Sequence, residues 1–116
     1  LLQSKRSEKM NQFMLVGRVK ELPEMTKTSK GIVVGKMVVE AERNFRNEDG
    51  SVSLDEFQVI LWRGIAEECV AACKLGNLIA VRGRVKSDVY DRNGINYYNT
   101  EIVAEKVSFL EKAGQA

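Results

Sequence analysis

Three aromatic residues, Phe45, Trp62 and Tyr90, lie at expected strand ends or hairpins. A flat ring can stack on any nucleic-acid base, and a Lys or Arg side chain can pair with any phosphate. Taken singly, each ring is more simply explained as a core or subunit-interface residue, because aromatic side chains bury a large apolar area. Their coincidence favours a surface that binds single-stranded nucleic acid. The basic residues near them are Arg46, Arg63, Arg82, Arg84, Lys86 and Arg92.

The sequence has few residues of the types that catalysis or metal binding requires. None of the 116 residues is His, the side chain most used for proton transfer near neutral pH and the commonest metal ligand. Cys69 and Cys73 are one helical turn apart and lack the second ligand pair of a zinc site, so we expect two core thiols. No nucleophile–base pair is evident. We therefore expect no enzyme, no metal site and no cofactor.

The stretch that positions Trp62 is a strand that runs directly into a helix. Over residues 57–62 side chains alternate between two faces; Phe57 begins the apolar face, and Trp62 lies on the other face, away from the core. From Arg63 onward the apolar residues recur at three- and four-residue steps, which predicts an amphipathic helix. Gly76 is the expected C-cap of this helix.

Four more strands are predicted from apolar or alternating runs, at residues 13–19, 32–43, 78–85 and 97–110. Pro23 should close the first strand and open a loop over residues 24–30. Residues 44–50 and 91–94 carry hairpin signals, with Phe45 on the first hairpin. This is an all-β chain with one helix between strands three and four, the order of a five-stranded oligonucleotide/oligosaccharide-binding barrel (OB-fold).

Gly17 and Gly83 lie in similar short sequences, VGRVK and RGRVK, and we expect both to bend a strand at a barrel corner.

The length is sufficient for one hydrophobic core, so we predict one domain over residues 10–111. Residues 1–9 are expected to be a disordered or expression-derived stretch, and residues 112–116 a short loose tail. The formal net charge is +2. We find no signal-peptide pattern and no apolar run long enough to cross a bilayer, which predicts a cytoplasmic protein.

The chain resembles the bacterial single-stranded-DNA-binding protein (SSB) family over nearly all of residues 10–111. The stretches that carry the resemblance are NQFMLVGRV (11–19), NFR (44–46), VILWRGIAE (59–67), KLGNL (74–78), VRGRV (81–85) and YNTEIVA (98–104). Their order and spacing are more specific than any one of them.

The resemblance implies an OB-fold, sequence-tolerant binding and protection of single-stranded DNA, usually a homotetramer, and no catalysis. By position, Phe45, Trp62 and Tyr90 match the family's base-stacking rings. It also implies a nucleoid-associated role in replication, recombination and repair. The acidic tip through which typical members recruit replication and repair proteins does not follow Phe109 here.

Acidic residues depart from the family pattern on the outward face. Glu56 stands where many members have an aromatic, and Glu40 and Glu42 stand where small neutral residues are more usual. Carboxylates facing phosphates would weaken binding, unless they lie at a subunit contact. They motivate an alternative hypothesis, an OB-fold adaptor of the primosome-accessory type whose sheet binds mainly proteins.

Overall fold

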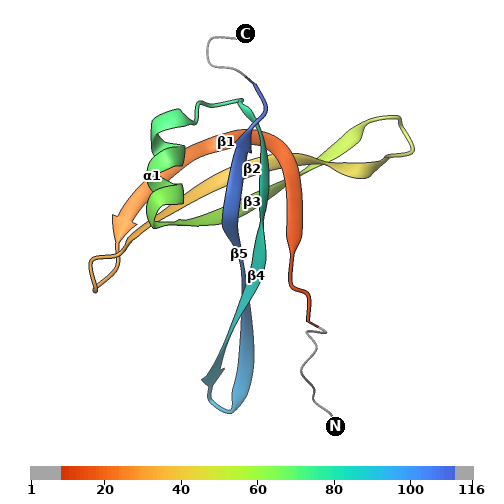
Figure 1. Ribbon diagram of the computed structural model, residues 1–116. Helices are drawn as coiled ribbons and strands as arrows, with labels where there is room; N and C mark the ends of the chain where they lie inside the picture. Colours follow the sequence, from red (N-terminus) through yellow and green to blue (C-terminus); the bar gives the residue numbers. More distant parts are fainter. Residues whose placement is uncertain (1–8, 112–116) are drawn as a thin grey trace.

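The computed structural model describes residues 9–111 and has the predicted order of elements (Figure 1). The strands close into a barrel in the order β1-β2-β3-β5-β4, and α1 lies between β3 and β4 in the chain. The predicted OB-fold barrel is confirmed. The terminal segments predicted at 1–9 and 112–116 lie outside the described residues, apart from Lys9. The elements are β1 (Phe13–Lys27), β2 (Val33–Arg46), β3 (Val52–Trp62), α1 (Arg63–Ala72), β4 (Leu78–Arg92) and β5 (Ile95–Phe109).

β1 joins two sides of the barrel because its halves pair with different strands. Residues 13–18 pair with β4, and residues 18–27 pair with β2, both antiparallel. β3 and β5 complete the closure by pairing in parallel at Val59–Ile102 and Ile60–Val103. The closed sheet leaves alternate side chains of every strand pointing outward.

Gly17 and Gly83 lie where strands pass too closely for a side chain. A Cβ atom at Gly83 would lie 1.9 Å from the carbonyl oxygen of Val103, and one at Gly17 would lie 2.4 Å from that of Glu40. Both contacts are with backbone atoms, which cannot move without disturbing the sheet. The close approach explains both glycines and agrees with the predicted barrel corners.

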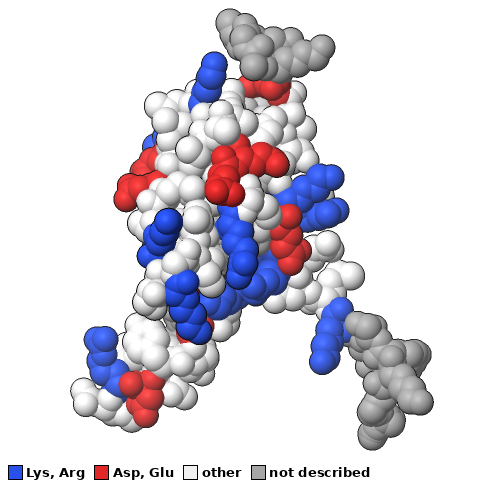
Figure 2. All heavy atoms as spheres, turned by 60° about the vertical axis from the view of Figure 1, so that its left-hand side comes forward, with Lys and Arg blue, Asp and Glu red and all other residues white. Residues whose placement is uncertain are grey.

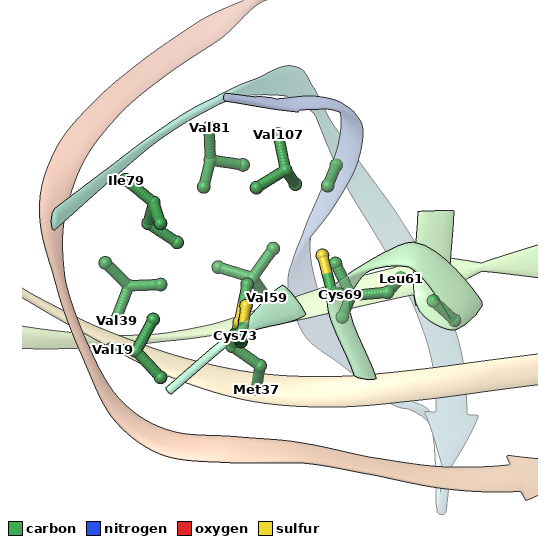
Figure 3. Packing of buried hydrophobic residues seen from close by; sticks show 12 residues of the cluster. Val19, Met37, Val39, Val59, Leu61, Cys69, Cys73, Ile79, Val81 and Val107 are labelled. Carbon is green, nitrogen blue, oxygen red and sulfur yellow. The ribbon is translucent and has the colours of Figure 1, made fainter. Parts of the chain in front are cut away.

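The core is formed by the inward faces of all five strands and one side of α1 (Figure 3). Ala66 and Cys69 of α1, and Cys73 just after the helix, pack on strand residues such as Met37 and Leu61. Both cysteines are free and buried, as predicted for core thiols. The adjacent Cys73 and burial raise the pKa of the Cys69 thiol, which keeps it protonated. Within residues 9–111 no helix is long and apolar enough to span a membrane.

Two hairpins extend beyond the barrel (Figure 1). We call them the β2–β3 arm (residues 42–54) and the β4–β5 arm (residues 86–101). The predicted Asn93-Gly94 turn is confirmed: both residues have positive φ, 55° and 80°, as a two-residue hairpin turn requires. The backbone N–H of Gly94 also donates to Asp91 Oδ1 at 2.9 Å.

Several predicted boundaries are wrong. β1 continues through Pro23 to Lys27, because the ladder with β2 is already irregular between Glu21 and Glu24 and a residue without an N–H is tolerated there. Phe45 belongs to β2 rather than to the hairpin loop. The arms make β4 and β5 longer than predicted, since β4 reaches Arg92 and β5 starts at Ile95.

Gly76 is not the C-cap of α1. The helix ends at Ala72, and Cys73 leaves it in an extended conformation, so no left-handed residue is needed there. Gly76, with φ of 82°, belongs to the following turn, in which the N–H of Asn77 donates to the carbonyl of Lys74 at 3.1 Å.

Candidate nucleic-acid interface

One face of β4 carries five of the nine predicted site residues. Ile79 and Val81 are buried in the barrel, so the even-numbered residues of this strand point outward. The same face continues onto the β4–β5 arm, because β4 is one strand from barrel to hairpin. The predicted site residues on this β4 face are Arg82, Arg84, Lys86, Tyr90 and Arg92, and the carboxylate of Asp88 lies among them.

A row of register partners extends this face across the barrel. Arg84 lies opposite Val103, Val103 opposite Ile60, and Ile60 opposite Lys36. Ile60 and Val103 are each 4% exposed but lie outside the core cluster, so they form an apolar floor between two cations. Three strand spacings of about 4.8 Å separate Lys36 from Arg84. The sequence reasoning missed Lys36, although alternation along the second predicted strand puts it on the same face as Glu40.

Trp62 ends β3 on the same outward face as Ile60. As alternation predicted, it lies outside the core cluster, where it is partly buried and pairs with Val34. Its backbone is extended, and α1 begins at the next residue. Arg63 makes this step with φ of 52°, in the left-handed region that costs a residue with a side chain about 1–2 kcal/mol. The exposed guanidinium of Arg63 therefore directly follows the Trp62 ring in the chain.

The β4–β5 arm holds two stacked rings. Tyr90 and Tyr97 are cross-strand partners with ring centroids 5.6 Å apart and planes 17° from parallel. The guanidinium carbon of Arg92 lies 5.8 Å from the Tyr90 centroid and 5.9 Å from that of Tyr97. These contacts orient both rings and the cation before any ligand arrives. Tyr97 was missed because its pairing depends on the register set by the hairpin turn.

The cations of the β4 face are loosely paired. Arg84 Nε lies 3.9 Å from Glu105 Oε2, and Lys86 Nζ lies 3.6 Å from Asp88 Oδ2 and 4.0 Å from Glu101 Oε1. These side chains are 32–54% exposed, and ion pairs that are open to solvent contribute roughly 0–1 kcal/mol. A phosphate could therefore replace the carboxylates at small cost.

Phe45 and Arg46 do not join this face. They lie on the β2–β3 arm, which points away from the β4–β5 arm (Figure 1). Phe45 is 62% exposed and lines a groove of about 600 Å³ with Leu15 and Phe57. Arg46 donates from Nη1 to the carbonyl of Gly50 at 3.1 Å and so helps to close its own hairpin.

A second group of charges occupies the outward face of β1, β2 and β3. Glu40 and Glu56 are opposite each other in register. Lys20 Nζ lies 2.5 Å from Glu56 Oε2 and 3.4 Å from Glu40 Oε2. Hydrogen bonds to Glu56 and then Glu40 raise the pKa of the Lys20 ammonium, so it stays charged. We call Lys20, Glu40 and Glu56 the acidic row.

Charged side chains are unevenly spread over one face of the molecule. In Figure 2, Lys and Arg side chains spread over the middle and lower part of the face and along the arm below, while most Asp and Glu side chains lie in the upper half. In residues 9–111 no three His, Cys, Asp or Glu side chains come together as a metal site.

Residues 10–110 match the profile of the Single-strand binding protein family. The chain belongs to this family. Its relatives include single-stranded DNA-binding protein B of Bacillus subtilis, 36% identical over 87% of this chain and 90% of that protein. Single-stranded DNA-binding protein 3 of Listeria innocua is 41% identical over 88% of this chain and 64% of its own length.

A solved structure supports the fold assignment of this SSB-family chain. It is titled "Plasmodium falciparum SSB complex with ssDNA" and superposes with a TM-score of 0.73 over 91% of this chain and 99% of that chain. The sequence identity is 19%, so the likeness concerns the barrel rather than individual side chains.

Proposed function

We propose that this SSB-family protein binds and protects single-stranded DNA with little sequence preference, by stacking bases on Trp62 and Tyr90 and pairing phosphates with the cations of the β4 face. The observation that carries the proposal is the continuous outward face that joins Trp62 and the Lys36–Arg84 row to the Tyr90–Tyr97 stack. The family membership and the names of the relatives support it.

Stacking and phosphate pairing account for the tolerance of sequence. Every base has a flat face, and stacking contributes roughly 1–3 kcal/mol per base by alanine substitution. Phosphates are the same at every nucleotide, so the contribution of Arg82, Arg84 and Lys86 to binding would not depend on the DNA sequence. Phe45 and Arg46 lie on the other arm, apart from this face, so we leave them out of the proposed path of the DNA.

The proposal includes no catalysis. The chain has no His, and we assign its outward side chains to holding a strand rather than to reacting with it. Such a role belongs to replication, recombination and repair in the cytoplasm, at the nucleoid, and requires no bound cofactor.

The adaptor hypothesis keeps one observation in its favour, the acidic row on an exposed sheet face. Titration with mixed-sequence oligonucleotides at low salt separates the two functions. We expect binding at micromolar protein or below, weakening as salt rises with a slope of about −0.7 in log K per log salt for each phosphate neutralised. Absence of binding under these conditions would leave only the adaptor.

A further inference from the structure

The outward surface of the barrel has two regions of opposite charge, and we infer that only one of them accepts the single strand. The acidic row closes the β1–β2–β3 side, which confines the strand to the β4 face and the Lys36–Arg84 row. The inference rests on the proposed function. It names the residues that limit the length of single-stranded DNA bound by one subunit.

The closed side has an excess of carboxylate. Glu42 follows Glu40 on the outward face of β2, and Glu56 lies opposite Glu40 on β3. Lys20 pairs with Glu40 and Glu56. Arg18 lies opposite Glu40 in register but pairs with Glu111, so the three carboxylates outnumber the one cation that is bound to them. A phosphate at this position would be repelled, because like charges at close range destabilise a complex.

The two sides differ in how tightly their cations are held. Lys20 Nζ approaches a carboxylate oxygen to 2.5 Å and has a second carboxylate at 3.4 Å. Arg84 on the open side has its carboxylate partner at 3.9 Å. Charge-assisted hydrogen bonds are strong near 2.7–2.9 Å and weaken with distance. Lys20 is therefore occupied by the protein itself, whereas Arg84 can exchange its partner for a phosphate.

Spacing along the strands keeps the regions apart. Lys36 and Ile60 of the open row lie four residues from Glu40 and Glu56, or about 13 Å at roughly 3.3 Å per residue. This distance exceeds the Debye length of about 10 Å at 0.1 M salt. Salt therefore largely screens a phosphate bound at Lys36 from the carboxylates of Glu40 and Glu56. A phosphate bound closer to these carboxylates would be repelled.

The test removes the charges of Lys20 and of its carboxylate partners Glu40 and Glu56, separately and together. In E40Q/E56Q, Lys20 loses its carboxylates and becomes available to phosphate. We expect more nucleotides covered per subunit and a salt slope steeper by about 0.7, which corresponds to one more phosphate neutralised. K20Q alone should leave the slope of the wild type unchanged, while K20Q added to E40Q/E56Q should remove the gain.

The matched control is E67Q/E68Q, which removes two exposed carboxylates from α1. It should leave the slope and covered length unchanged, and equal melting temperatures would show that all variants fold. The inference is overturned if E40Q/E56Q behaves as the wild type, if K20Q alone flattens the slope, or if the α1 control gives the same gain. A wild-type protein that binds no strand would instead contradict the proposed function.

Discussion

At the scale of the residue, Arg63 combines a strained backbone with an exposed guanidinium, and two substitutions separate these properties. Arg63→Gly should relieve a left-handed conformation that costs a residue with a side chain about 1–2 kcal/mol, whereas Arg63→Ala should keep that cost. Both remove the cation. We expect the glycine variant to melt higher than the alanine variant, and both to weaken oligonucleotide binding equally, with a salt slope flatter by about 0.7.

Calorimetry and binding titration at several salt concentrations would measure both effects. Arg43→Ala is a matched control: it also removes an exposed Arg, but one that bonds Asp55 at 3.1 Å on the β2–β3 arm. An unchanged salt slope in both Arg63 variants would show that Arg63 does not contact phosphate. Equal stability of the two would contradict the strain.

At the scale of the element, the crossing of β4 and β5 depends on Gly83. A Cβ atom there would lie 1.9 Å from the Val103 carbonyl oxygen, so Gly83→Ala must separate two strands of the barrel. We expect a loss of roughly 1–3 kcal/mol in unfolding free energy, as for other overpacked sites, measured by urea denaturation. Gly64→Ala is the control, because its Cβ meets no atom within 4 Å and alanine favours a helix by up to about 1 kcal/mol. Equal losses in both variants would contradict the crowding at Gly83.

Elements also show what the sequence could predict. Alternation and turn residues predicted the order of the elements along the chain, the helix and the outward position of Trp62, because these depend on neighbours in the sequence. The lengths of the arms could not be found in this way, since their residues leave the core and lose the apolar pattern that marks a strand. The Tyr90–Tyr97 stack and the closeness of Lys36 to Arg84 depend on register between strands, which no local pattern specifies.

At the scale of the whole molecule, apolar side chains on the outside of the barrel suggest contact with further copies of the chain. Met14, Val16 and Leu54 are 70%, 51% and 49% exposed. Phe13 packs against the core of its own barrel, so its outward-facing neighbours Met14 and Val16 are the better candidates for this contact.

We propose a homo-oligomer, a tetramer by family resemblance, and expect light scattering at tens of micromolar to give a mass above one chain. Val16→Glu should lower that mass, because a buried unpaired charge is costly. Leu75→Glu, at an exposed turn near α1, should leave it unchanged. A monomer in the wild type would contradict the proposal.

The most direct measurement uses the single tryptophan, because Trp62 lies on the outward face that we assign to the strand. Adding poly-pyrimidine single strand should quench its fluorescence, since bases stack on the ring. Trp62→Ala and Tyr90→Ala should each weaken binding about five-fold to over a hundred-fold, the equivalent of roughly 1–3 kcal/mol, and leave the oligomer intact. The account would be contradicted if Trp62 fluorescence did not change on addition of the oligonucleotide and if Trp62→Ala lowered the melting temperature but left the affinity for DNA unchanged.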